Sequence, residues 1–169
     1  DGSSVTTYVH DGEGRRIGVT DRAGTRSFLV GPSVGGLDSP HLVTSASGAT
    51  VAEFVYAGEH ALCRRTAGGT GRYYLRDAMG SVIALTDDAG AVTASIEYDA
   101  FGEQIAGSGP AATLPSDTAG DFRFQGMWAD PSGLYHVRAR TYDPRVGPFT
   151  TPDPIAGDHE QPETWHPYA

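Results

Sequence analysis

The chain has 169 residues, and its 12 Lys and Arg against 21 Asp and Glu leave a formal net charge of −9 at pH 7. Nucleic-acid binding through phosphates requires a concentrated basic surface, so this charge argues against a general nucleic-acid partner. No apolar run is long enough to cross a bilayer, and the first residues lack the basic and apolar regions of a signal peptide. We therefore expect no membrane span and an internal piece of a longer polypeptide. The single Cys63 cannot form an intrachain disulfide and is expected to be a small buried side chain.

Three stretches within residues 1–105 share a layout in which a tyrosine near a strand end is followed by aspartate and then glycine. Aspartate starts a turn by accepting a backbone N–H two residues on, and glycine supplies the positive φ that such turns need. A second signature, Thr-Asp-x-Ala-Gly, interleaves with these stretches around Asp21 and Asp87. The turn and repeat residues predicted in this way are Tyr8, Asp11, Gly14, Tyr74, Asp77, Gly80, Asp87, Gly90, Tyr98, Asp99 and Gly102.

The stretches between these turns alternate apolar and polar side chains. Ala94 and Ile96 are predicted to point to one face, and Ser95 and Glu97 to the other. The turn spacing leaves strands of about six residues, which is typical of antiparallel hairpins. No helix is expected over residues 1–105. The prediction is an all-β fold of antiparallel hairpins arranged as a meander.

Composition divides the rest of the chain. Residues 106–120 are rich in Gly, Ala, Ser and Pro and are expected to form a flexible loop. A denser block with aromatic and Asp-Pro motifs follows over residues 121–157, and an acidic tail occupies residues 158–169. The N-terminal part divides into hairpin repeats over residues 1–71 and a second block over residues 72–105, whose sequence motif is more distinctive than the short repeats.

These motifs resemble the RHS/YD-repeat family, specifically its repeat-associated core. The resemblance covers residues 72–157 most closely and extends over 1–71 as short YD repeats; 72–105 corresponds to the start of the core and 121–157 to its signature block. It is carried by Tyr73–Val82, Phe122–Gly126, Gly133–Tyr135, Arg138–Pro144 and Phe149–Ile155, in the order and spacing of the core.

The resemblance implies a spiral β-sheet that closes into a hollow shell, with the core at one end. Family members are secreted or injected carriers, similar to the C subunits of Tc toxins and to bacterial RHS effectors, and many hold a C-terminal toxin inside. The implied partners are the rest of the shell and this cargo, and the implied localisation is secreted or extracellular. No cofactor or metal is expected; His159 and His166 lack further ligands at metal-binding spacing.

The resemblance also implies a self-cleaving aspartyl-protease-like site. Such chemistry needs two carboxylates around one water, one ionised and one protonated, and a nearby Arg can stabilise the oxyanion. Arg140 and Asp153 match two of the family's catalytic positions, whereas the second Asp would lie beyond residue 169. The local motif also departs from the family pattern, because Gly157 arrives one residue late.

Simpler interpretations stand beside the catalytic one. Asp153, like Asp130 and Asp143, precedes proline and is a good turn residue. Arg140 shares a strand face with Arg138 and His136, which is typical of either a solvated charged face or a polar site. Aromatic side chains that can serve packing or, alternatively, a sugar-stacking platform are Tyr73, Tyr74, Phe122, Phe124 and Trp128.

Three functions remain open from the sequence. The first is a structural shell and core segment that encapsulates an effector, with no enzymatic turnover of its own. The second is an aspartyl autoprotease acting in cis in the longer parent chain. The third is an extracellular glycan- or receptor-binding β module. Because unpaired strand edges associate readily, the isolated chain is expected to pair through edge strands or to curl into a small open barrel or sandwich.

Overall fold

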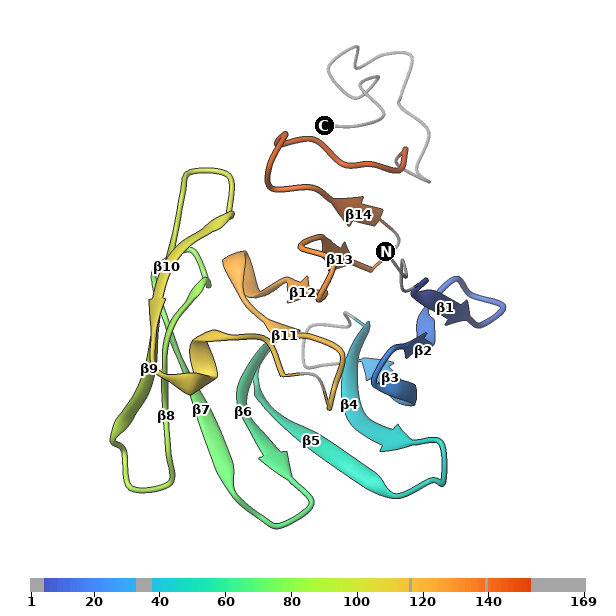
Figure 1. Cartoon of the computed structure of the whole chain (residues 1–169), viewed down its shortest axis with the longest axis horizontal. Coiled ribbons are helices and arrows are strands. Elements are labelled where there is room, and N and C mark those ends of the chain that lie inside the picture. The colour runs from blue at the N-terminus through green and yellow to red at the C-terminus, as the bar shows by residue number, and fades with distance from the viewer. Residues whose placement is uncertain (1–4, 33–37, 116, 139, 153–169) are drawn as a thin grey trace.

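The computed structural model describes residues 5–32, 38–115, 117–138 and 140–152, which form two antiparallel sheets (Figure 1). The large sheet contains β1 (Thr7–His10), β2 (Arg16–Asp21), β3 (Gly24–Pro32), β4 (Asp38–Ser45), β5 (Thr50–Ala57), β6 (His60–Thr66), β7 (Gly71–Arg76), β8 (Val82–Thr86), β9 (Val92–Tyr98) and β10 (Gln104–Ser108). The small sheet contains β11 (Asp121–Phe122), β12 (Trp128–Ala129), β13 (Tyr135–Val137) and β14 (Arg140–Tyr142), and two short 3₁₀ turns, η1 (Pro110–Ala112) and η2 (Phe124–Gly126), lie beside the strands.

Each strand of the large sheet pairs with its neighbours in the sequence, so the strand order is β1 to β10 without a crossover. The small sheet likewise runs β11 to β14. The described residues contain no α-helix, and no helix there is long and apolar enough to cross a bilayer. The predicted all-β antiparallel meander is confirmed.

The turns at Asp11, Asp77, Asp87 and Asp99 share one geometry. In each, an aspartate Oδ1 accepts the backbone N–H groups of the residues two and four positions later, at 2.8 to 3.0 Å. The glycine three positions after each aspartate has φ between 79° and 94°, a region that side chains with a Cβ adopt only with strain. The side chain and the glycine of one short segment therefore suffice to reverse the chain.

Recurrent β-bulges curve the large sheet. In each even-numbered strand the register slips by one residue and leaves one residue without a cross-strand partner: Ile17, His41, Leu62, Ile83 and Ile105. A bulge bends its strand and increases the local twist. Their repetition at nearly equal intervals makes the large sheet wrap around the small sheet, as Figure 1 shows.

The core lies where the concave face of the large sheet meets the small sheet. Phe28 of β3 and Phe54 of β5 pack edge-to-face on Trp128 of β12, with ring centroids 5.9 and 5.6 Å apart. Phe122 of β11 lies 5.3 Å from Trp128 and 5.5 Å from Phe54 in the same orientation. The two sheets are therefore joined by an aromatic cluster whose members are all nearly fully buried.

The segment 106–120 differs from the flexible loop expected from its composition. Residues 106–108 belong to β10, and the buried residues of the segment include Ala111, Ala112, Thr118 and Ala119. A Cβ at Gly109 would overlap the backbone of Thr93. The small residues of this segment therefore allow it to lie close against β9, a role that composition alone does not distinguish from flexibility.

Candidate functional site

A buried ion pair joins the first hairpin to the small sheet. Arg16 of β2 donates from Nη1 to Oδ2 of Asp130 at 2.8 Å, and both side chains are 6% exposed. The guanidinium of Arg16 also stacks on the ring of Tyr8 at 4.7 Å, and the Tyr8 hydroxyl lies 3.5 Å from the same carboxylate oxygen. Burial raises the pKa of Asp130 above its usual value, against the opposing effect of Arg16.

His136 of β13 lies close to this pair and is held neutral. Burial, together with the positive charge of Arg16, lowers the pKa of His136 to about 3. A neutral imidazole accepts on one nitrogen and donates on the other, so His136 adds polarity to the interior without adding charge.

Acidification is expected to destabilise the chain through His136. An unfolded histidine binds a proton near pH 6.5, whereas the folded one does so near pH 3, so the unfolded state holds more protons between these values and stability falls as the pH falls. Between pH 7 and pH 5 this group should remove about 2 kcal/mol of unfolding free energy. Urea unfolding of the wild type and of His136→Gln at both pH values measures it, and an equal loss in the two proteins would contradict the assignment.

A second polar cluster fastens β11 and the segment before it to the middle of the large sheet. The Tyr74 hydroxyl of β7 donates to Oδ1 of Asp121 at 2.5 Å, and the Arg123 guanidinium lies 3.6 Å from the other oxygen. Arg64 of β6 donates to Asp117 at 2.5 Å. Burial, followed by the charge of Asp121, raises the pKa of Tyr74 well above its usual value, so this tyrosine remains a hydrogen-bond donor.

The third repeat tyrosine also points toward the interior. The Tyr98 hydroxyl donates to the carbonyl oxygen of Val82 at 2.8 Å, and its ring lies 5.7 Å from that of Phe124 in η2. The tyrosines Tyr8, Tyr74 and Tyr98 thus all contact residues of the small sheet or its turns, while the aspartates of the same motifs shape the hairpins.

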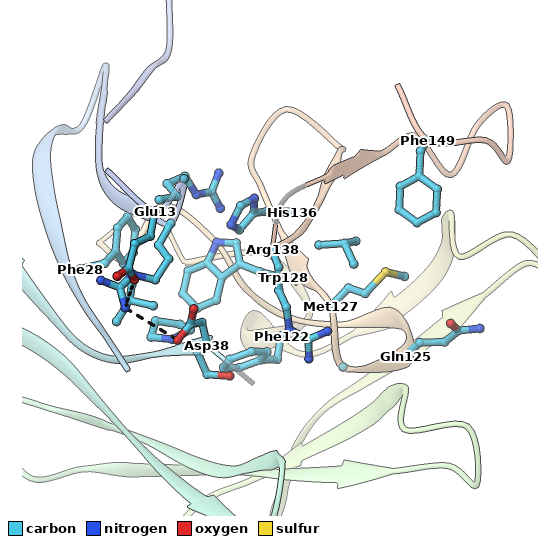
Figure 2. Close-up of a pocket in the computed structure, with 18 residues that line it drawn as sticks. Glu13, Phe28, Asp38, Phe122, Gln125, Met127, Trp128, His136, Arg138 and Phe149 are labelled. Carbon is cyan, nitrogen blue, oxygen red and sulfur yellow. Dashed lines mark ion pairs between the residues drawn. The ribbon is translucent and has the colours of Figure 1, made fainter. Parts of the chain in front are cut away.

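A pocket of about 460 Å³ opens between the two sheets beside the Arg16–Asp130 ion pair (Figure 2). Glu13 and Asp38 lie on the side of the large sheet, together with Phe28. Trp128 and Arg138 lie on the side of the small sheet. The pocket is lined by the residues of both sheets and is therefore formed only when the chain is folded.

Arg140 begins β14 and lies over Phe149, with its guanidinium carbon 3.5 Å from the ring centroid. The segment after Phe149 is tied to the same strand, because the Thr150 N–H donates to the carbonyl oxygen of Thr141 at 2.7 Å. Asp153 lies outside the described residues, so its pairing with Arg140 stays a prediction.

The two aspartates expected to act in turns differ from each other. Asp143 accepts the backbone N–H of Arg145 and pairs with its guanidinium at 2.7 Å near the surface. Asp130 also closes a turn, accepting from the Gly133 N–H at 2.9 Å, but its side chain is buried against Arg16. A turn-only role is therefore incomplete for Asp130, because its ion-pair partner lies far away in the sequence.

Buried aromatic residues argue against a sugar-stacking platform. Tyr74, Phe122 and Trp128 are at most 7% exposed and pack against one another or against Phe54. Such side chains offer no free ring face to a glycan, so packing is their role.

A model of the Teneurin YD-shell family matches residues 1–169, the whole chain. The chain belongs to this family. The meander of short hairpins described above is therefore a segment of a YD-shell.

The curated relatives of this YD-shell chain are bacterial toxins and nucleases. The chain is 33% identical over 155 residues to the tRNA3(Ser)-specific nuclease WapA of Bacillus spizizenii and 32% identical over 155 residues to the tRNA nuclease WapA of Bacillus subtilis. It is 29% identical over 175 residues to the double-stranded DNA deaminase toxin A of Burkholderia cenocepacia. Each match covers 89% of this chain, which spans only 6% of the WapA proteins and 12% of the deaminase toxin.

Solved Tc toxin structures share the YD-shell fold. The TcdB2-TccC3-Cdc42 crystal structure superimposes with a TM-score of 0.64 at 20% identity, over 96% of this chain and 8% of that chain. The Photorhabdus luminescens Tc holotoxin pore gives 0.64 at 18% identity, over 99% and 8%. TcdB2-TccC3 without its hypervariable C-terminal region gives 0.62 at 19% identity, over 97% and 8%. Identities this low show the common fold alone.

The buried charges of this YD-shell were missed by reasoning from the sequence. Asp121 and Arg123 flank Phe122 in the block that carries the family resemblance, so their position offered a signal. Arg16 and Arg64 offered none, because each lies in a strand whose alternation equally allows an exposed arginine. Their partners became known only from the packing of the two sheets.

Proposed function

We propose that this YD-shell chain forms part of the wall and the inner plug of a closed β-shell that encloses a C-terminal effector domain of a longer, exported polypeptide. The observation that carries the proposal is the curved ten-stranded sheet, whose concave face is covered by the small sheet and fastened to it by the buried Arg16–Asp130 ion pair. The strands β1 and β10 lie at the edges of the large sheet, where further strands of a shell can pair.

The relatives support this proposal through what differs among them. Their names describe a tRNA nuclease and a DNA deaminase toxin, yet both match this chain over the same share of its length. One similar Tc toxin structure is described as lacking a hypervariable C-terminal region. A common shell segment combined with different effectors accounts for both facts. The proposal also implies that the parent polypeptide carries an effector, is exported and acts outside the cell.

The experiment is protease protection of the parent polypeptide. The effector domain should resist an added protease in the intact shell and be digested when it is expressed alone. Mild denaturant that opens the shell should make the enclosed domain sensitive at the same denaturant concentration at which the shell unfolds. Equal digestion of enclosed and free effector would refute encapsulation.

A second candidate function is self-cleavage that releases the effector. Arg140 is held beside the segment that leads directly into Asp153, through its stacking on Phe149. An arginine there can hold a carboxylate ionised or stabilise an oxyanion, and a second aspartate of the parent chain would complete the site.

Cleavage should depend on both side chains. In the parent polypeptide, Asp153→Asn and Arg140→Gln are expected to leave the chain intact on a denaturing gel, whereas the wild type splits into shell and effector. Asp143→Asn is the matched control, because Asp143 also precedes proline but pairs with Arg145 at the surface. Splitting of Asp153→Asn at the wild-type rate would exclude Asp153 as a catalytic residue.

A further inference from the structure

The pocket between the two sheets combines an apolar wall with a cationic group. Trp128, Met127 and Val137 line the side of the small sheet, and Phe28 lies opposite. At about 460 Å³ the pocket is large enough for a bulky side chain together with a neighbouring polar group. Figure 2 shows Trp128, Arg138 and Phe122 in its middle, between Asp38 on one side and Phe149 on the other.

The charges on the large-sheet side of the pocket are already matched. Arg15 pairs with Asp11 at 2.7 Å and with Glu13 at 3.0 Å, and it lies 4.0 Å from Asp38. Arg16 is paired with Asp130. A ligand with a positive charge would therefore compete with Arg15 for carboxylates that are in use.

Arg138 differs from these arginines. It is exposed, lines the pocket, and forms no ion pair or hydrogen bond with any other residue in the described part of the chain. An unmatched guanidinium at the edge of an apolar pocket favours an anionic group, and its planar fork suits a carboxylate.

Backbone strain is concentrated at the same place. Three non-glycine residues in the described ranges have positive φ, and two of them, Arg138 at 53° and Gln125 at 49°, line the pocket. Such conformations persist only where the surrounding structure imposes them, and they cluster at ligand-binding sites. The positive φ of Arg138 sets the direction in which its side chain leaves the backbone at the wall of the pocket.

We propose that this pocket binds a peptide that presents an aromatic or branched aliphatic side chain next to a carboxylate. The apolar side chain packs against the partly exposed Met127 and Val137, and the carboxylate accepts hydrogen bonds from the Arg138 guanidinium. A carboxylate is favoured over a phosphate because Glu13 and Asp38 on the opposite wall repel a doubly charged group. That the peptide belongs to the enclosed effector rests on the proposed function; the binding itself does not.

The test is fluorescence anisotropy with the whole 169-residue chain and labelled, C-terminally amidated Gly-Ser peptides that carry one Phe-Glu pair. Replacing Glu with Gln, or Phe with Ala, in the peptide should weaken binding about tenfold, the usual scale for one charge-assisted hydrogen-bonding group or one buried side chain. A peptide that ends in a free Phe carboxylate distinguishes a terminal from a side-chain carboxylate as the ligand.

The variant Arg138→Gly removes the guanidinium and suits a φ of 53°, so it should keep or raise the melting temperature while weakening the Phe-Glu peptide about tenfold. The Gln peptide should then bind wild type and variant equally. Arg22→Gln, an equal charge loss in the exposed turn between β2 and β3, should leave both affinities unchanged.

Equal binding of the Glu and Gln peptides to the wild type, or no binding of either, would overturn the proposal without recourse to any variant. The samples in these binding measurements contain neither an effector domain nor a closed shell. Failure here and failure of the protection experiment are therefore distinguishable.

Discussion

Replacing Asp130 with alanine is expected to lower the unfolding free energy by about 3–5 kcal/mol, the range for breaking a buried ion pair from one side. The reason is the buried partner left behind: the Arg16 guanidinium lies 2.8 Å from Asp130, and its side chain is 6% exposed. Without the carboxylate, this charge remains in the interior with neither water nor an anion. Urea unfolding at pH 7, followed by circular dichroism, measures the loss.

Removal of both charges should cost far less than removal of one. The double variant Arg16→Met with Asp130→Leu replaces the pair by apolar groups of similar size, a change that is often close to neutral. The exposed pair gives the matched control, because Asp143→Ala breaks the contact with Arg145, whose side chain is 57% exposed, and is expected to cost at most ~1 kcal/mol. A double variant as unstable as Asp130→Ala would show that shape, rather than charge, accounts for the loss.

Trp128→Ala is expected to cost a further large amount, about 3–5 kcal/mol, as for other large-to-small changes in a core. The indole is 5% exposed and contacts rings from both sheets, with centroids 5.3 Å from Phe122, 5.6 Å from Phe54 and 5.9 Å from Phe28. Its removal leaves a cavity between the two sheets, and the rigid strands on either side cannot move together to close it.

The readout is thermal or urea unfolding together with near-ultraviolet circular dichroism, which reports the packing of the aromatic cluster. Leu29→Ala is the control, because Leu29 lies on β3 next to Phe28 but is 62% exposed; it should change stability by less than ~1 kcal/mol. A loss for Trp128→Ala no larger than for Leu29→Ala would show that the two sheets are held together elsewhere.

The hairpins were predictable because their signals are local. The Asp77 carboxylate accepts hydrogen bonds from the backbone N–H groups of Met79 and Ser81, and Gly80 adopts the positive φ of the turn. All of these residues lie within one short segment. Alternation along β9 likewise predicted that Ala94 and Ile96 are buried. Information of this kind lies within a few residues and needs no knowledge of the rest of the fold.

The bulges were not predictable in the same way. Leu62 and Ile83 are the extra residues of β6 and β8 and are 46% and 42% exposed, and an alternating pattern gives no sign that one residue is to be left unpaired. The curvature that these bulges produce decides where the large sheet meets the small one, and hence where the pocket lies.

By itself, the sequence determined an all-β chain of short antiparallel strands with aspartate–glycine corners, since those corners act on their own backbone. Only the tertiary structure decided which charges are buried, because partners such as Arg16 and Asp130, or Tyr74 and Asp121, are separated by 114 and 47 residues. Whether a given Asp-Pro only turns the chain or also holds a distant arginine depends on what packs over it. That is set by the curvature of a whole sheet rather than by any short run of residues.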